Sequence, residues 1–517
     1  MYVGEDPLFG LMNRIGKPVD GHRPFPRYRT TPGGWRTLVE SLGGNTLSVV
    51  GLWGEPAAVH VALREELSGD VVVVSLDCPN GHFPSLSAVR PSVIRLERTA
   101  CDLFGLVADG AVDPRPWLDH GAWGVTHPLA VPPGPAPAEP QRYPFLKTEG
   151  EGLHQIPVGP VHAGIIEPGH FRFTANGETV ARLEQRLGYV HKGIEGLMAG
   201  RTVGDAARLA ARISGDATVA HSLAFARAVE AALGVAVPPR AVWLRGVMAE
   251  LERLANHLGD IGAICNDAAF AFMLAEMGRL REAVLLTNDA VFGHRLLMDR
   301  VVPGGVSVDL PDDGGKRILE LVAELRRRFP PLVAIYESKA SLQDRTVGTG
   351  IVSIRLVSRF GTGGYVGRAS GRGQDARRTP GYAPYDDLDF EIPVLTAGDV
   401  NARVWVRIRE VEQSLSLLEQ MIRRMPGVPR DSHGRTPLPR VDLPAGAGEG
   451  MALVESFRGE IMTWVRLADD GTVARCHPRD PSWFQWPLLE AAIEGNIVAD
   501  FPLCNKSFNG SYSGHDL

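Results

Sequence analysis

Residues 250–267 read ELERLANHLGDIGAICND. Its apolar residues return every three or four positions, which is the period of one face of an α-helix. The same spacing extends back to Ala241, so we predict one long helix over residues 241–264. The pattern recurs along the chain and predicts further helices over residues 205–233, 268–298, 316–329 and 400–425, the last with Asp399 as its N-cap. A bundle of long helices is the expected centre of the chain.

Two dipeptides predict hairpins beside this bundle. Asn176–Gly177 and Asp470–Gly471 each lie between strand-like residues. Asn-Gly and Asp-Gly readily adopt the positive φ angles of a type I′ turn, which joins two antiparallel strands. We therefore expect small antiparallel sheets flanking the bundle and an α+β fold overall.

The first part of the chain has a different character. LSVVGLWG (47–54) and VVVVSLDC (71–78) carry strand signals, and AVHVALREEL (58–67) between them is predicted to be a helix. A run rich in proline follows, and such runs favour extended linkers. The expected organisation is an N-terminal arm, a small α+β domain, a Pro-rich linker and a main domain, over residues 1–34, 35–129, 130–150 and 151–517.

Composition excludes several classes of function. The 517-residue chain has a net charge of −6 and no long Lys/Arg block, so it lacks the electrostatic footprint of a nucleic-acid-binding protein. No apolar run approaches the ~20 residues of a membrane span, and the first residues do not resemble a signal peptide. The five cysteines are scattered without a Cys-x-x-Cys pair, which predicts isolated core residues and neither disulfides nor a metal site.

Several motifs, taken together, resemble one family. They are EPGHFRF, GYVHKGIEGLM, ELERLANHLGDIGAICND, GHRLLMDRVVPGGV, DARRTPGYAPYDDLDFEIPVLTAGDVNAR, FRGE and GNIVADFPLCNKSFNGSYSGHDL. They look like the large subunit of membrane-bound, energy-converting nickel–iron hydrogenases, which is homologous to the quinone-site subunit of respiratory complex I. LERTACDLFGL and WGVTHPL similarly resemble the small α+β subunit of complex I, and the two subunits are fused in formate-hydrogenlyase-type hydrogenases.

The resemblance implies a lost metal site. In the hydrogenases, four thiolates from two Cys-x-x-Cys motifs hold the nickel–iron centre. Here those positions fall on Ser214 and Ala217 in RISGDA, and on Ser511 and Gly514 in SYSG. Alanine and glycine have no donor atom, and a serine hydroxyl is a poor substitute for a soft thiolate. We expect no nickel–iron centre, and we expect Cys504, which lies outside the motif, to be a packed residue.

Of the two quinone-binding positions of the complex I pattern, one is present and one is changed. The hairpin histidine that binds the quinone headgroup matches His170, whereas the matching tyrosine position falls on Gly215. Further residues match the family's cavity and proton route, namely His162, Glu167, Glu195, His221 and Asp500. Arg212 matches an arginine that faces the iron–sulfur cluster of a partner small subunit. Each has a structural alternative, such as an exposed hairpin histidine, a surface arginine or a structural ion pair.

Two other stretches could be functional: one has two possible interpretations, and the other does not fit a nucleotide site. Asp375, Arg377, Tyr382, Tyr385 and Asp386 suit hydrogen bonding between subunits or, alternatively, form a solvated loop. The glycine-rich residues 361–373 lack the strand–glycine loop–helix context of a nucleotide site.

The sequence therefore predicts a subunit of an NADH-quinone oxidoreductase-like or hydrogenase-like complex on the cytoplasmic face of the membrane. The implied partners are an iron–sulfur small subunit and antiporter-like and quinone-module-like membrane subunits. The chain itself would hold no metal, and quinone or another carrier is the implied acceptor of electrons in a reaction coupled to ion movement. A non-catalytic scaffold and a hydrogenase with unorthodox ligands are the rival hypotheses.

Overall fold

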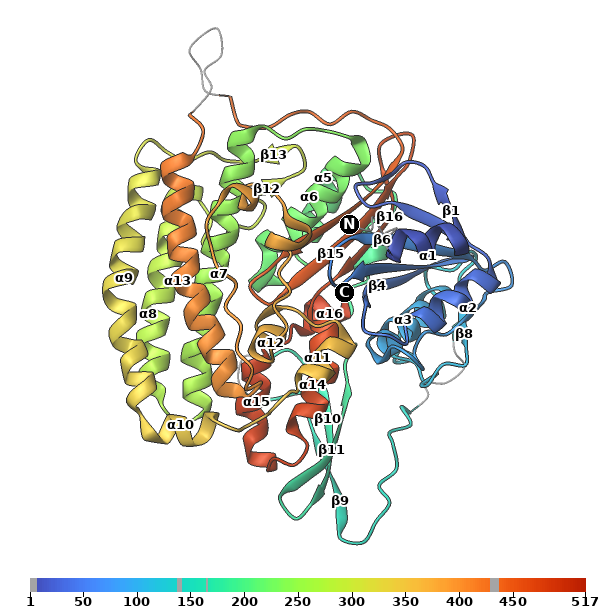
Figure 1. Ribbon diagram of the computed structural model, residues 1–517, viewed down its shortest axis with the longest axis horizontal. Coiled ribbons are helices and arrows are strands. Elements are labelled where there is room, and N and C mark those ends of the chain that lie inside the picture. The colour runs from blue at the N-terminus through green and yellow to red at the C-terminus, as the bar shows by residue number, and fades with distance from the viewer. Residues whose placement is uncertain (1–6, 137–141, 164–165, 428–436) are drawn as a thin grey trace, which may run out of the picture.

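The computed structural model describes residues 7–136, 142–163, 166–427 and 437–517. A sheet-rich N-terminal domain lies beside a bundle of long helices, and small sheets lie between and below them (Figure 1). The predicted α+β class, with a small domain followed by a long-helix bundle flanked by antiparallel sheets, is confirmed.

The N-terminal domain is built on a five-stranded sheet in the order β1-β3-β6-β5-β4. Its strands are β1 (Gly16–Val19), β3 (Arg27–Thr30), β4 (Leu47–Glu55), β5 (Ala58–Glu65) and β6 (Val71–Asp77). The domain also holds α1 (Pro7–Ile15), α2 (Pro32–Ser41), α3 (Ile94–Phe104), β7 (His82–Pro84) and β8 (Val107–Asp109).

The predicted helix over residues 58–67 is wrong, because this segment is strand β5. Glu55 pairs with Ala58, so two residues join β4 to β5 in a tight hairpin. Val59, Val61 and Leu63 alternate along the strand and are fully buried. Strand β5 is an interior strand of the sheet, and its polar residues His60 and Arg64 are buried as well. The alternation of apolar and polar residues along it has the period of a strand, and the helix prediction overlooked this signal.

The first thirty residues contribute to two sheets. Strands β1 and β3 join the N-terminal sheet through β6. Strand β2 (His22–Arg23) pairs in parallel with β14 of the main domain. The Arg27 guanidinium also pairs with Glu449 on that strand. These contacts fix the N-terminal domain to the main domain.

Four long helices form the bundle. They are α7 (Pro239–Asp267), α8 (Ala271–Phe292), α9 (Gly314–Ser338) and α13 (Val400–Arg424), which run side by side in Figure 1. The Asp399 carboxylate accepts a hydrogen bond from the Ala402 N–H at 2.7 Å, so the predicted N-cap is confirmed. Helix α9 continues past Phe329 through Pro330 and Pro331, beyond the predicted end.

The helix predicted over residues 205–233 is broken in the middle. Helix α5 (Val203–Ala210) ends, Ser214 adopts an extended backbone, and α6 (Thr218–Leu233) begins after a single 3₁₀ turn. The Thr218 hydroxyl donates to the Ala211 carbonyl across the break at 2.7 Å. Since apolar spacing continues on both sides, the sequence pattern does not reveal this interruption.

Two antiparallel sheets support the bundle, and both predicted hairpins are present. One contains β9 (Leu153–Val158), β10 (His170–Asn176) and β11 (Thr179–Arg186); the other contains β14 (Gly448–Glu455), β15 (Glu460–Leu467) and β16 (Val473–Arg479). Asn176 pairs with Thr179, so the first turn consists of Gly177 and Glu178, one residue later than predicted. Gly177 alone of the predicted pair has a positive φ, +58°.

The remaining elements are short. They are α4 (Ile194–Met198), α10 (Ala340–Thr346), α11 (Ile354–Phe360), α12 (Gly364–Ala369), α14 (Ser482–Ile493), α15 (Phe501–Phe508), α16 (Tyr512–Asp516), β12 (Val301–Val302) and β13 (Gly305–Val306).

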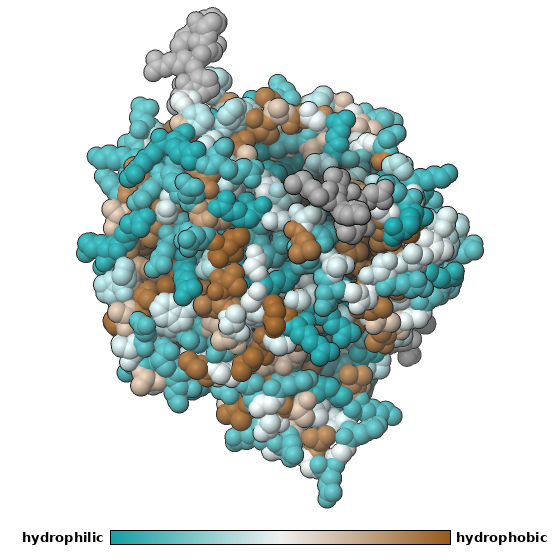
Figure 2. Space-filling view, in the orientation of Figure 1, coloured by the Kyte–Doolittle hydropathy of each residue, from teal (hydrophilic) through white to brown (hydrophobic). Residues whose placement is uncertain are grey.

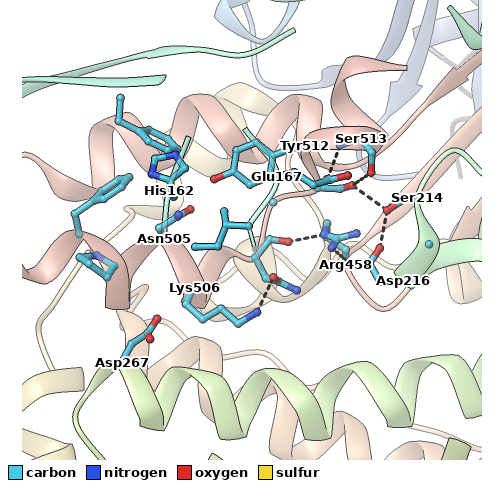
Figure 3. Close-up of a pocket in the computed structure, with 18 of the residues that line it drawn as sticks. His162, Glu167, Ser214, Asp216, Asp267, Arg458, Asn505, Lys506, Tyr512 and Ser513 are labelled. Atoms are coloured by element: carbon cyan, nitrogen blue, oxygen red, sulfur yellow. Dashed lines mark hydrogen bonds and ion pairs between the residues drawn. The ribbon is translucent and has the colours of Figure 1, made fainter. Parts of the chain in front are cut away.

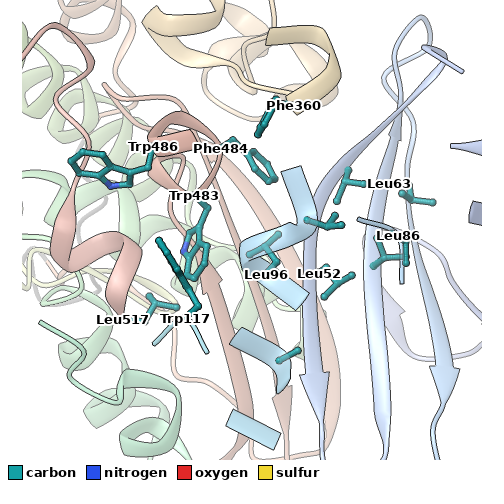
Figure 4. Packing of buried hydrophobic residues seen from close by; sticks show 14 of the residues in the cluster. Leu52, Leu63, Leu86, Leu96, Trp117, Phe360, Trp483, Phe484, Trp486 and Leu517 are labelled. Atoms are coloured by element: carbon teal, nitrogen blue, oxygen red, sulfur yellow. The ribbon is translucent and has the colours of Figure 1, made fainter. Parts of the chain in front are cut away.

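One apolar core runs across the boundary between the two domains. Leu52, Leu63 and Leu96 of the N-terminal domain belong to the same buried cluster as Trp483 and Trp486 of α14 (Figure 4). Trp117 and Trp483 both contact the His515 ring. This continuous packing positions the end of the chain against the N-terminal domain.

The surface is mostly hydrophilic on the face shown in Figure 2, where apolar side chains gather in small groups. Across the described ranges, no helix combines the length and apolar character needed to span a bilayer.

Candidate functional site

A cavity of about 500 Å³ opens where the broken helix, the β9–β10 connection and the last helices meet (Figure 3). Val158, Ile166, Phe171 and Phe501 give it an apolar wall. The polar lining comes from segments far apart in the sequence, and includes His162, Glu167, Ser214, Asp216, Asp267, Arg458, Asn505, Lys506, Asn509, Ser511, Tyr512 and Ser513. An apolar wall with a few converging polar groups is typical of a small-molecule site.

The two motifs singled out in the sequence meet at this cavity. Ser214 and Ser511 are hydrogen-bonded through their hydroxyls at 2.9 Å. The Ser214 hydroxyl donates to Asp216 at 2.6 Å, and Ser511 accepts from the Gly514 N–H at 2.9 Å as the N-cap of α16. The two altered motifs therefore lie side by side, and the hydroxyls of Ser214 and Ser511 are hydrogen-bonded to each other.

The residues at these four positions do not fit a nickel–iron centre. They offer two hydroxyl oxygens and no thiolate, which is the wrong donor set for a soft metal site. A Cβ atom added to Gly514 would lie 2.8 Å from Asp480 Oδ2, so a side chain fits at this position only if Asp480 shifts. Within the described residues, no group of three or more His, Cys, Asp or Glu side chains is placed to hold a metal.

Cys504 does not supply the missing sulfur. It is fully buried on α15, where burial raises the pKa of its thiol to about 11 despite the nearby Arg403. A Cβ atom on Gly350 would come within 2.5 Å of its Sγ, so the sulfur packs against that backbone. Cys504 is absent from the cavity lining, in agreement with the prediction of a packed residue.

Arg458 is the central cation of the site. Its side chain is buried, and its guanidinium pairs with Asp216 at 2.6 Å and donates to the Asn509 carbonyl at 2.6 Å. Burial would raise the pKa of Asp216, but Arg458 outweighs it and holds that pKa below its usual value. Asp216 thereby supplies a negative charge from within the same motif that lacks cysteines.

Two of the predicted site residues line the cavity. The His162 Nε2–H donates to the Gly169 carbonyl at 2.8 Å, which fixes the ring beside Phe171. Glu167 accepts a hydrogen bond from the Ser513 N–H at 3.0 Å, so its carboxylate is tied to the C-terminal motif. Both come from the connection between β9 and β10.

His170 lies outside the cavity lining. It precedes Phe171 on β10, and successive side chains of a strand point to opposite faces. Phe171 lines the cavity, whereas His170 contacts Phe145 and donates from Nδ1 to the Gly159 carbonyl at 3.1 Å. Burial lowers the pKa of His170, with Arg172 acting in the same direction.

Asp500, His221 and Glu195 are held in ion pairs away from the lining. Asp500 faces Arg345 at 3.4 Å. His221 is buried and donates to Asp480 at 3.1 Å. Burial would raise the pKa of Glu195, but its pairs with Arg475 and His477 lower it to about 2.

Arg212 is exposed, although its neighbours Ala211 and Ile213 are buried. Its guanidinium binds the Asp299 carboxylate with two hydrogen bonds of 2.8 Å. An iron–sulfur cluster placed beside it would therefore meet a cation already partly neutralised by Asp299.

The polar run from Asp375 to Tyr385 is neither a subunit contact nor a solvated loop. Asp375, Arg377, Tyr382 and Tyr385 are buried inside the chain, and only Asp386 of that set is exposed. Asp375 and Arg377 belong to a set of buried, paired charges between α7, α12 and α13, and Tyr382 and Tyr385 contact this set. We call it the buried charge band; its members are Glu250, Arg253, Arg368, Asp375, Arg377, Glu410 and Glu455.

Sequence reasoning missed three lining residues that matter most. Asp216 lies between the two altered positions of the first motif, Arg458 lies within FRGE, and Tyr512 lies between the altered positions of the second. Arg458 and Tyr512 belong to motifs that carry the family resemblance, and Asp216 belongs to the altered metal motif RISGDA. A comparison of each motif for gained as well as lost functional groups would have found them.

Comparisons with known proteins agree with this geometry. The model for the 49 kDa subunit of respiratory-chain NADH dehydrogenase matches residues 267–516, the nickel-dependent hydrogenase model matches residues 192–259, and the 30 kDa subunit model matches residues 46–131. These matches define the class of protein, a large subunit of the hydrogenase and complex I type that carries a smaller fused domain.

Three individual relatives are examples of this class of protein. Hydrogenase-4 component G of Escherichia coli is 31% identical and the match covers 89% of this chain and 80% of the relative. The carbon monoxide-induced hydrogenase of Rhodospirillum rubrum is 32% identical, over 69% and 97% of the two chains, and NADH-quinone oxidoreductase subunit 4 of Thermus thermophilus is 31% identical, over 71% and 94%.

A solved structure gives the same result. A chain of the membrane-bound sulfane sulfur reductase, an archaeal respiratory membrane complex, superposes with a TM-score of 0.64 at 26% identity and covers 72% of this chain and all of its own. The chain belongs to the family of membrane-bound nickel–iron hydrogenase and complex I 49 kDa-type large subunits, fused here to a 30 kDa-type domain.

Proposed function

We propose that this chain is the fused large subunit of a membrane-associated complex I-like oxidoreductase that works without a nickel–iron centre. Support comes from its relatives, among them a membrane-bound hydrogenase subunit and an NADH-quinone oxidoreductase subunit. On this proposal the chain lies on the cytoplasmic face of the membrane, against an iron–sulfur small subunit and next to antiporter-like and quinone-module-like subunits.

The observation that carries the proposal is the cavity between the two altered motifs. It offers hydroxyl, carboxylate and guanidinium groups facing an apolar wall, and this combination suits a flat organic molecule with carbonyl oxygens. A quinone fits this description. It would accept two electrons from the partner's iron–sulfur cluster and two protons from the medium, and leave as the quinol.

His162 and Glu167 are the proposed polar groups at the cavity mouth, and Asp216 and Arg458 are the charged pair at its inner end. His170, His221, Asp500 and Arg212 would act only indirectly, through the elements they brace or the partner they face. Any coupling to ion movement would pass through the membrane subunits, because no described helix of this chain can span a bilayer.

The test is purification of the complex from its native membrane. We expect an iron–sulfur subunit to copurify, and we expect the complex to reduce a short-chain ubiquinone analogue with reduced methyl viologen as electron donor. A complex without any cluster-bearing subunit, or one that neither binds nor reduces the analogue, would overturn the proposal.

The second candidate function is a non-catalytic scaffold. The specific observation in its favour is the Ser214–Ser511 hydrogen bond, because a pair of hydroxyls that satisfy each other needs no ligand. The same purification separates the two functions, since a scaffold would assemble with its partners and leave the quinone analogue unbound.

A further inference from the structure

Most polar groups that line the cavity already have partners. Ser214, Ser511 and Asp216 bind one another, and His162 Nε2 donates to Gly169. Among the buried polar atoms of the described lining, two make no hydrogen bond of good geometry: Arg458 Nη1 and the Tyr512 hydroxyl. Buried donors without a partner are costly, and in a cavity they indicate where a ligand atom belongs.

Tyr512 is held rigidly in the wall. Its side chain is only 7% exposed, and its ring packs on Trp486 with centroids 4.8 Å apart. On its other side lies Gly169, where an added Cβ atom would come within 2.5 Å of Tyr512 Cε1. The glycine thus makes room for the ring, and the two contacts fix the direction of the hydroxyl.

The hydroxyl is directed toward the space between His162 and Asn505, and the Asn505 side chain interacts with it without forming a hydrogen bond of good geometry (Figure 3). Burial raises the pKa of Tyr512 to about 12, so the phenol remains a neutral hydrogen-bond donor at any physiological pH. A neutral phenol donates well to a carbonyl oxygen and does not repel an uncharged ligand.

We propose that Tyr512 is the specificity-determining hydrogen-bond donor for a carbonyl oxygen of the quinone-type ligand. The first motif has Gly215 where a tyrosine is expected from the complex I pattern, and Tyr512 of the second motif places a phenol in the same cavity from the opposite end of the chain. This inference rests on the proposed function and adds the residue that selects the ligand.

The test is Tyr512→Phe in the purified complex, because this change removes one oxygen and keeps the ring. We expect binding of a short-chain ubiquinone analogue to weaken about three- to tenfold, the usual effect of losing one neutral hydrogen bond. We also expect the infrared carbonyl stretch of the bound, ¹³C-labelled analogue to move to higher frequency. Tyr189→Phe is the matched control, since Tyr189 lies outside the cavity lining.

The outcomes are distinguishable. If the unaltered complex binds no quinone analogue, the proposed function fails. If it binds the analogue and Tyr512→Phe leaves both affinity and carbonyl frequency unchanged, the assignment of Tyr512 is overturned while the proposed function stands. A lower thermal midpoint in Tyr512→Phe with unchanged affinity assigns Tyr512 to packing, and this also overturns the inference.

Discussion

Asp216 and Arg458 show how a single residue can replace the charge of a lost site. Arg458 is buried, and a buried guanidinium without a counter-ion is strongly unfavourable. Asp216 provides that counter-ion from within the altered first motif, and its hydroxyl neighbour Ser214 holds the carboxylate in place. The sequence contains both residues in recognised motifs, but their pairing across 242 positions is visible only in three dimensions.

We therefore predict that Asp216→Ala destabilises the protein by on the order of 1–3 kcal/mol, since Arg458 loses its only carboxylate partner among the described residues. The measurement is the thermal midpoint of the full chain. Asp387→Ala is the control, because Asp387 is exposed and should change the midpoint little. Equal midpoints for the two variants would show that Arg458 does not depend on Asp216.

At the scale of elements, helix α6 begins in an unusual way. Ala217 at its N-cap provides no side-chain hydrogen bond. The Glu252 carboxylate of α7 accepts from the Val219 and Ala220 N–H groups instead, at 2.7 and 3.1 Å. A neighbouring helix thus caps the break that positions Ser214 and Asp216, and this arrangement cannot be predicted from local sequence.

Glu252 gives this cap a pH dependence. Burial raises its pKa from 4.5 to about 8. A carboxyl whose pKa is higher in the folded than in the unfolded protein stabilises the fold at low pH, and this contribution is lost as pH rises through the folded pKa. We predict that stability falls by about 1 kcal/mol between pH 7 and 8.5, where histidines no longer titrate in the unfolded chain.

The measurement is the thermal midpoint across this window in the full chain and in Glu252→Gln, which keeps a neutral side chain at every pH. The variant should show a flatter profile. A midpoint that rises with pH, or an equal slope in both proteins, would contradict the role of Glu252.

Helix α13 offers a direct comparison between a buried and an exposed carboxylate. Glu410 is buried and binds Arg368 at 2.6 Å and His257 at 2.7 Å, whereas Glu419 pairs with Arg326 at the surface at 3.1 Å. We predict that Glu410→Gln costs on the order of 2–4 kcal/mol and Glu419→Gln less than about 1 kcal/mol. Thermal midpoints measure both, and equal effects would show that the buried charge band contributes little.

These elements show where prediction from sequence stops. The long helices and the N-cap at Asp399 follow from local pattern, and the structure confirms them. The break at Ser214 depends on tertiary contacts that override local pattern, whereas strand β5 carries a period-two alternation that the helix prediction overlooked. For the site, His162 and Glu167 were found through motifs, while strand alternation placed His170 on the other face.

At the scale of the whole molecule, the cavity depends on segments from most of the main domain. The N-terminal domain shares a core with α14 and braces the C-terminal motif through Trp117 and His515. The retained architecture and the altered motifs together support the proposed large subunit of a redox complex, in which this cavity would take an organic molecule in place of a metal.

The nickel content of the native complex shows whether the altered motifs still hold a metal. We predict that the complex, purified from nickel-replete cells, contains far less than one nickel per chain, because the four positions of the metal motifs are Ser214, Ala217, Ser511 and Gly514. Elemental analysis of the purified complex provides the measurement, with iron from the partner subunit as the internal reference. One nickel per chain would contradict the account.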